Sequence, residues 1–340
     1  MKGYLPRILA IASVLMFGML IAKPAHAGAV ITNGSGVYLG VNDEGHLNFT
    51  DGVTVPVNAS AVGVSFVFPD GSLRDATAPG CLCEGWGVAA THPTLGTHSG
   101  DADVSVGGVD NLTVDSFVST PSTATSIVHL TSLPGLTVKQ EYFPSASSSL
   151  FENRVTITNT TGDTVTDVRY SRAMDWDVPP TEFAEYVTIG GLPAANVIFT
   201  SDNGFAEPDP VTGGGRIDIG GCPTTGNFTD CGVDDHGALF DFGFGSLADG
   251  ESRVFSIFYG ATPTEPLAFA ALGTVGAEVY SLGQQSGDPS GGTPATYIFG
   301  FKGVGGTPLP DPNVIPEPGT LLLLGSGLVG LYGKTRKKLA

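Results

Sequence analysis

One short acidic motif has the residue types and spacing to do chemistry. Asp175 and Asp177 flank Trp176 at the end of a run that alternates like a β-strand, and Glu182 and Glu185 follow soon after. Because residues i and i+2 of a strand point to the same face, both aspartates are expected to project into one place. Such a pair could act as the acids of a glycosidase, as part of a sugar-binding platform, or as calcium ligands.

The same motif also has a purely structural interpretation. An ion pair between Arg172 and an aspartate could hold the sheet together, while Trp176 packs in the core. Trp86 is expected in the core as well. We predict the structural role, with no catalytic residue, and keep calcium at Asp175 and Asp177 as the alternative.

Acidic residues in other loops are further candidate calcium ligands. They are Asp101, Asp103, Asp202, Asp209, Asp234 and Asp235. Calcium takes about 6–8 oxygen ligands, but these residues match neither the EF-hand spacing nor an acidic repeat. Solvated acidic loops are therefore expected, and no cofactor is predicted, with Ca²⁺ as the alternative.

The first 27 residues have the three parts of a secretory signal peptide. Two basic residues precede an apolar run over residues 8–22, and the small residues Ala25 and Ala27 stand just before Gly28. This run is shorter than the ~20 residues of a membrane-spanning helix. We therefore predict cleavage between Ala27 and Gly28, and export of the remaining chain.

The other end of the chain combines a short motif, an apolar run and a basic tail. The motif is Pro316-Glu317-Pro318. The apolar run contains Leu321, Leu322, Leu323, Leu324, Leu328 and Leu331. The tail contains Lys334, Arg336, Lys337 and Lys338. An apolar helix followed by cations is typical of a membrane segment with a basic stop on its cytoplasmic side, so we predict a membrane helix here.

In this order the three parts resemble the PEP-CTERM sorting signal of Gram-negative bacteria, a segment also labelled ice-binding protein C-terminal domain. The resemblance implies recognition by an exosortase, a membrane protein similar to a transpeptidase. It also implies cleavage near Pro316–Pro318 and transfer to the envelope or to an exopolysaccharide-linked destination.

Four cysteines, Cys81, Cys83, Cys222 and Cys231, are the remaining reactive side chains. An even number in an exported chain indicates disulfides. We favour the local pair Cys222–Cys231, which leaves Cys81 with Cys83, over crossed pairs that would join the two halves of the chain. A Cys-x-Cys metal or redox site at Cys81 and Cys83 is the alternative with a specific chemical function, but no His or third Cys lies nearby in the sequence.

Hydrophobic alternation between the two ends predicts strands almost throughout. The runs are 62–68, 112–118, 126–130, 136–143, 150–159, 164–172, 237–244, 252–259 and 295–301. Short strands separated by Gly, Pro and Asp turns indicate a sandwich. One window, 266–282, favours a helix because it is rich in Ala and Leu. We therefore predict an all-β fold: a large β-sandwich, a supersandwich or two packed sandwiches, with one short helix.

A 16-residue stretch supports the fold class by resemblance. Residues 155–170 resemble the V-x-I-x-N-x-(T/S)-G hairpins of bacterial Ig-like surface modules. The predicted organisation is a signal peptide (1–27), a β-sandwich ectodomain (28–305), a Gly/Pro stalk (306–313) and a sorting signal with its membrane helix (314–340).

Charge is distributed unevenly along the 340 residues. The whole chain has 15 Lys and Arg against 33 Asp and Glu, a net charge of -18. Seven of the basic residues lie in the two ends, so residues 28–315 hold 8 basic and 32 acidic residues. This composition argues against nucleic-acid binding, and it repels anionic polysaccharide unless divalent cations bridge the two.

Together these features predict a non-enzymatic protein of the cell envelope or extracellular matrix of a Gram-negative bacterium. Its expected role is adhesion or association with exopolysaccharide, and its expected partners are exosortase, the membrane and matrix components. The alternative is a carbohydrate-binding protein or carbohydrate-active enzyme with an acidic cleft around Asp175, Asp177 and Glu182.

Overall fold

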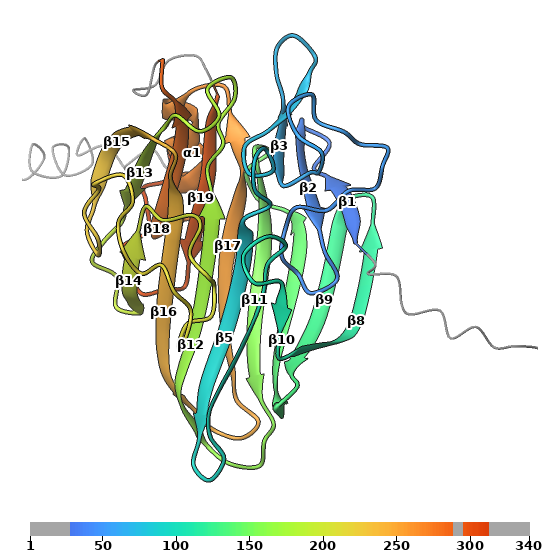
Figure 1. Ribbon diagram of the computed structural model, residues 1–340, viewed down its shortest axis with the longest axis vertical. Helices are drawn as coiled ribbons and strands as arrows, with labels where there is room; N and C mark the ends of the chain where they lie inside the picture. Colours follow the sequence, from blue (N-terminus) through green and yellow to red (C-terminus); the bar gives the residue numbers. More distant parts are fainter. Residues whose placement is uncertain (1–27, 288–294, 313–340) are drawn as a thin grey trace, which may run out of the picture.

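The computed structural model describes residues 28–287 and 295–312, which form three antiparallel sheets and one helix (Figure 1). Ala25 and Ala27 of the predicted cleavage site lie outside the described residues, as do the sorting motif, the apolar leucine run and the basic tail. Within the described ranges, no helix is long and apolar enough to cross a membrane.

A nine-stranded sheet is the largest sheet of the fold. Its strands in spatial order are β15 (Phe228–Asp234), β13 (Glu185–Gly190), β18 (Val279–Gln285), β19 (Thr296–Lys302), β17 (Ser252–Thr262), β11 (Leu150–Asn159), β10 (Leu133–Pro144), β9 (Thr123–Leu130) and β8 (Leu112–Thr120). Buried and less buried residues alternate strictly along β9, as expected of a strand with one face on a core. This alternation is the pattern from which the sequence predicts strands.

Two smaller sheets cover one face of the large one. The first contains β14 (Val197–Ser201), β16 (Gly237–Leu247), β12 (Val165–Asp175), β5 (Glu84–His92), β6 (Gly96–Ala102) and β7 (Val109–Asp110). The second contains β1 (Ala29–Thr32), β2 (Val37–Val41), β3 (Val64–Val67) and β4 (Leu73–Asp75). In Figure 1, β16, β12 and β5 stand in front of the large sheet and the second sheet lies to their right. The predicted all-β sandwich is confirmed.

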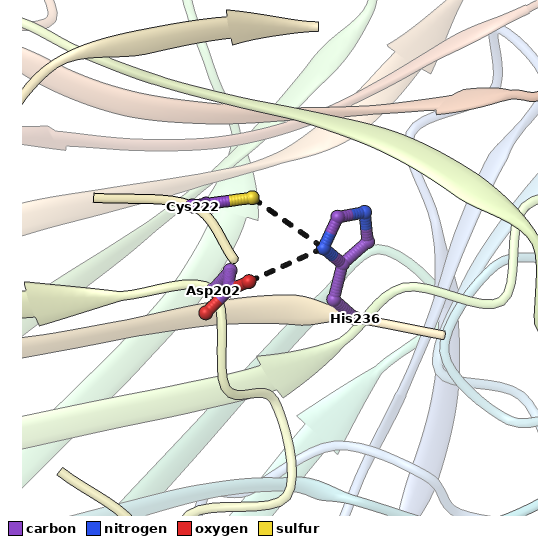
Figure 2. Close-up of side chains that lie close together, drawn as sticks. All are labelled: Asp202, Cys222 and His236. Atoms are coloured by element: carbon purple, nitrogen blue, oxygen red, sulfur yellow. Dashed lines mark hydrogen bonds and ion pairs between the residues drawn. The ribbon is translucent and has the colours of Figure 1, made fainter. Parts of the chain in front are cut away.

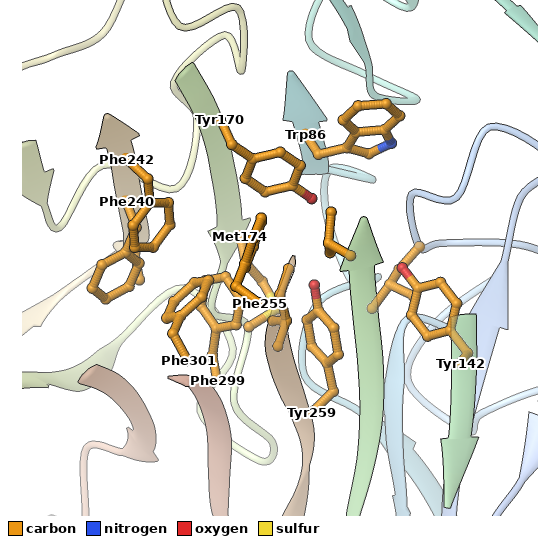
Figure 3. Close-up of a cluster of buried hydrophobic side chains, with 14 of the residues drawn as sticks. Trp86, Tyr142, Tyr170, Met174, Phe240, Phe242, Phe255, Tyr259, Phe299 and Phe301 are labelled. Atoms are coloured by element: carbon orange, nitrogen blue, oxygen red, sulfur yellow. The ribbon is translucent and has the colours of Figure 1, made fainter. Parts of the chain in front are cut away.

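The core between the layers is rich in aromatic residues (Figure 3). Trp86 of β5 is fully buried and stacks on Tyr170 of β12, with ring centroids 5.8 Å apart. Tyr170 in turn meets Phe255 of β17 edge-on at 5.0 Å, so the contact crosses from one sheet to the other. The prediction that Trp86 belongs to the core is confirmed.

A fully buried ion pair lies in this aromatic core. Nε of Arg172 on β12 donates to Oε1 of Glu84 on β5 at 2.5 Å, and both side chains have no exposed surface. The guanidinium also donates to Gln140 Oε1 at 2.9 Å and to the hydroxyl of Tyr142 at 3.1 Å. Gln140 and Tyr142 belong to β10, so the network ties the two sheets together. The predicted partner of Arg172 was an aspartate, and the structure corrects it to Glu84.

The helix is shorter than the 266–282 range that the sequence predicts. α1 (Glu265–Val275) ends where Gly276 adopts a left-handed conformation with φ of 66°, and the chain then enters β18. Leu272 of α1 packs with Phe258 and Ile298 on the face of the large sheet that the smaller sheets leave uncovered. The predicted helix over 266–282 is therefore right in its first half and wrong in its second.

The residues that follow β19 return to the fold. The carboxylate of Glu278 accepts hydrogen bonds from the backbone N–H groups of Gly303, Val304 and Gly306, at 2.8–3.0 Å. The N–H of Leu309 donates to the carbonyl of Ala277 at 2.8 Å. The described part of the predicted stalk therefore lies against the region of α1 instead of extending freely.

The buried ion pair leads to a prediction about stability. Arg172→Met removes the cation and leaves the Glu84 carboxylate buried without its partner, so we expect a loss of about 3–5 kcal/mol in the free energy of unfolding. Chemical denaturation of the purified chain measures this loss. Arg154→Met is the control, because the exposed Arg154–Glu152 pair on β11 should contribute less than about 1 kcal/mol. Equal losses in the two variants would contradict the role given to the buried pair.

Candidate metal centre

The Asp175-Trp176-Asp177 motif lies where β12 ends. The Trp176 side chain is fully buried, and its Nε1 donates to Ser281 Oγ of β18 at 3.1 Å. The indole lies over Gly283, where an added Cβ would come within 2.6 Å of the ring. The carboxylates of Asp175 and Asp177 come together, as the i, i+2 alternation predicts. The prediction that Trp176 packs in the core is confirmed.

A third aspartate joins them from the turn between β15 and β16. One carboxylate oxygen each from Asp175, Asp177 and Asp235 lie within 4.8 Å of one another. The register explains this, since Gly237 at the start of β16 pairs directly with Asp175. An added Cβ at Gly237 would lie 2.1 Å from the carbonyl oxygen of Met174, so this close approach requires glycine.

Glu185, the first residue of β13, lies near enough to these aspartates for their charges to act on one another. Its Oε1 accepts a hydrogen bond from the N–H of Val178 at 3.2 Å, and its Oε2 is buried without a partner among the described residues. Glu182, the third acid of the predicted cleft, accepts instead from Asn58 Nδ2 at 2.8 Å. Asp175, Asp177, Glu185 and Asp235 together form the carboxylate cluster.

Three of the four side chains of the carboxylate cluster are buried, and Asp235 is half-buried. Exposed fractions are 1% for Asp175 and 0% for Asp177 and Glu185. Among the described residues, Asp175 Oδ1, both carboxylate oxygens of Asp177, and Asp235 Oδ1 have no hydrogen-bond partner. None of the four residues forms an ion pair within that part of the chain. An unpaired buried carboxylate is costly, so a group of four calls for protons or a cation.

Burial is the main cause of unusual acidity in the carboxylate cluster. It raises the pKa of Glu185 to about 9, and the charges of Asp175 and Asp235 act in the same direction. Burial also raises the pKa of Asp177, and the neighbouring charges of Asp175, Glu185 and Asp235 add to this effect. Without a cation, these groups therefore hold protons at pH values where ordinary carboxylates are ionised.

The two disulfides lie beside the carboxylate cluster. The structure pairs Cys81 with Cys83 and Cys222 with Cys231, which is the local pairing that the sequence favours. Sγ of Cys81 lies 3.3 Å from Asp175 Oδ2 but has no hydrogen to donate in the disulfide. The carbonyl of Cys83 accepts from the N–H of Asp175 at 3.2 Å, which fixes the backbone there.

A second group of ligand types lies close by but has a structural role (Figure 2). Nδ1 of His236 lies 3.3 Å from Asp202 Oδ2 and 3.7 Å from Cys222 Sγ. The sulfur of Cys222 is already bonded to Cys231, and Nε2 of His236 lies 3.1 Å from the carbonyl oxygen of Glu185. Asp202 also accepts from two backbone N–H groups. These contacts anchor the residue that follows Asp235.

The other acidic loops use their carboxylates in turns. Asp103 accepts from the N–H groups of Ser105 and Val106, and Asp209 accepts from two N–H groups of its own turn and from Ser99. Burial, with the charge of Asp209 next, raises the pKa of Asp101 to about 7. The expectation that these loops are solvated is wrong for Asp101, Asp103, Asp202 and Asp209, which are buried. The carboxylates of Asp103, Asp202 and Asp209 accept hydrogen bonds from nearby backbone N–H groups, which indicates a structural role.

The raised pKa values predict how stability depends on pH in the presence of a chelator. Because the folded chain holds protons that the unfolded chain releases near pH 4, its unfolding free energy should fall as the pH rises from about 5 to about 9, by about 1.4 kcal/mol per pH unit for each retained proton. Asp177→Asn removes one such group and should be more stable than the unaltered chain at pH 8.

Denaturation of both proteins across this pH range provides the measurement, and the difference between them isolates Asp177 from other groups. Asp75 of β4, Glu185, Asp235 and His236 also face the site and are left in place. Asp249→Asn, in the exposed turn at the opposite end of β16 from Gly237, should reproduce the unaltered profile. An unaltered chain that gains stability between pH 5 and 8 relative to Asp177→Asn would contradict the electrostatic account.

Comparison with known proteins finds a match in the C-terminal segment of the chain. A family model described as the PEP-CTERM protein-sorting motif matches residues 314–337. This match contains Pro316-Glu317-Pro318 and the apolar run after it, so the predicted resemblance is confirmed. No curated protein matches the chain. The motif marks the chain as a protein that is exported, processed by exosortase and sorted to the cell surface of a Gram-negative bacterium.

Proposed function

We propose that the β-sandwich is a non-enzymatic adhesion or exopolysaccharide-associated module, delivered to the cell surface by the sorting segment behind it. The observation that carries this proposal is the PEP-CTERM motif at residues 314–337, which follows a large acidic β region. In this proposal exosortase recognises Pro316-Glu317-Pro318, the leucine run holds the chain in the membrane, and Lys334 to Lys338 set its orientation.

The charges of the sandwich limit the kind of polymer it can bind. All eight Lys and Arg of residues 28–312 have partners within the described structure. Six of them form ion pairs: Arg74–Asp70, Lys139–Glu141, Arg154–Glu152, Arg169–Asp167, Arg172–Glu84 and Arg216–Asp241. Arg253 and Lys302 donate to the backbone carbonyls of Gly303 and Val275. An anionic polysaccharide therefore needs divalent cations to approach this surface.

A carbohydrate-active enzyme is the alternative function. Its acids would be Asp175 and Asp177, and the burial of both side chains argues against it because a sugar ring has no route to them. A lectin that binds neutral sugars elsewhere on the surface is compatible with the same fold. Release of reducing ends distinguishes the enzyme from either binding protein.

Sorting provides the first test of the proposal. In the native host, deletion of residues 316–340 should move the protein from the membrane and surface fractions into the soluble fraction, because it removes both the motif and the apolar run. Replacing Pro316 and Pro318 by Ala should instead leave an unprocessed form of higher mass in the membrane. Immunoblots of fractionated cells measure both outcomes.

A pair of prolines just outside the motif provides the matched control. Replacing Pro308 and Pro310 by Ala should leave both sorting and mass unchanged. A truncated protein that still sediments with membranes would show that the C-terminal segment is not the anchor.

Polymer binding provides the second test. We expect the purified chain to co-sediment with the exopolysaccharide of its host without releasing reducing ends. If that polymer is acidic, binding should fall at least about tenfold when EDTA removes divalent cations, since every Lys and Arg of the described residues already has an acidic or backbone carbonyl partner. Polygalacturonate and dextran serve as defined acidic and neutral controls. Release of reducing ends would favour the enzyme, and a lack of binding to any of the polymers would contradict the proposed role.

A further inference from the structure

We infer that the carboxylate cluster of Asp175, Asp177, Glu185 and Asp235 is a buried Ca²⁺ site that joins the end of β12 to the turn between β15 and β16. This inference does not depend on the proposed function, because it concerns a site inside the sandwich and not the sorting segment or the outer surface. It rests on unpartnered oxygens, on their spacing and on the chemistry of the ligands.

Unpartnered oxygens are the first observation. Asp177 has no exposed surface, and neither of its carboxylate oxygens has a hydrogen-bond partner among the described residues. Three further oxygens are also buried without a hydrogen-bond partner among the described residues: Asp175 Oδ1, Glu185 Oε2 and Asp235 Oδ1. Native structures satisfy nearly all buried polar atoms, so unsatisfied oxygens on Asp175, Asp177 and Asp235, which lie together, indicate a bound group.

The spacing of the oxygens fits calcium. Oxygens from Asp175, Asp177 and Asp235 all lie within 4.8 Å of one another. Ligands on opposite sides of Ca²⁺ are about 4.6–5.2 Å apart, because each lies about 2.3–2.6 Å from the ion. All three oxygens can therefore bind one ion without large movement. Mg²⁺ requires about 2.0–2.1 Å and near-octahedral geometry and usually keeps several waters, so a site built from several protein carboxylates favours Ca²⁺.

The ligand types also select calcium. All four side chains offer hard carboxylate oxygens, whereas Zn²⁺ sites are usually built from Cys and His. The neighbouring Cys222 and His236 do not supply such a site, since Cys222 is bonded to Cys231. Calcium sites of extracellular proteins commonly bind with Kd values of about 10⁻⁴–10⁻³ M, which suits an exported chain.

The site would join segments that few other contacts hold. β15 is the edge strand of the large sheet, and residues 232–234 at its end are exposed. The Cys222–Cys231 disulfide holds the chain before Asp235, and His236 holds it after Asp235. A Ca²⁺ ion would hold Asp235 itself against the end of β12, so binding should stabilise the fold and protect this edge first.

Thermal unfolding of the purified full chain tests the inference. After treatment with EGTA and dialysis at pH 7.5, 10 mM CaCl₂ should raise Tm by about 3–8 °C, whereas 10 mM MgCl₂ should raise it by less than about 1 °C. Asp177→Asn and Asp235→Asn should each abolish most of the calcium-dependent rise. These two variants alter different segments, so a folding defect in one does not remove the test.

Asp110→Asn provides the matched control. Asp110 is exposed and pairs with Asp101 in the other acidic region, so the variant removes an equal charge away from the site. It should keep the full rise in Tm. A chain whose Tm does not respond to calcium, or an Asp177→Asn variant that responds as the unaltered chain does, would overturn the inference.

Discussion

The buried ion pair between Arg172 and Glu84 is the interaction on which the rest of the structure depends. It places one charge of each sign in an aromatic core and satisfies both with hydroxyl and amide partners from the opposite sheet. Because Arg172 lies on β12, the network sets the position of this strand between β5 and β16. Asp175 follows three residues later on the same strand, so the site at the strand end inherits that position.

Arg172 on β12 and Asp177 just beyond its end are buried in opposite electrostatic surroundings. Around Arg172, hydrogen bonds and an opposite charge compensate for lost hydration, so the guanidinium needs no further partner. Around Asp177, every neighbouring charge has the same sign and the oxygens lack donors. Such a group is stable in the folded protein only if something outside the described chain neutralises its charge. A bound cation is the simplest explanation of the unpartnered oxygens.

Local patterns in the sequence predict much of this fold. The alternation over residues 150–159 matches β11 at both ends, and the i, i+2 spacing correctly brings Asp175 and Asp177 together. β5 escapes prediction because Gly85 and Gly87 interrupt its pattern, and the structure shows why glycine is needed there. An added Cβ at Gly87 would lie 2.3 Å from the carbonyl oxygen of Pro208.

Long-range partners are what the sequence does not reveal. Glu84 lies 88 residues before Arg172, and Asp235 reaches Asp175 only through the pairing of β12 with β16. The choice of Glu185 over Glu182 depends on which residue begins β13. Conversely, the disulfides and the acidic motif are separate features of the sequence that the fold brings side by side.

Terbium luminescence tests the central claim, that the carboxylate cluster is a cation site, most directly. Tb³⁺ binds calcium sites, and its emission is sensitised by a nearby indole, which Trp176 provides between Asp175 and Asp177. The account predicts emission that saturates at one ion per chain, that calcium displaces, and that Asp177→Asn abolishes. Emission that is absent, or that persists unchanged in Asp177→Asn, would contradict it.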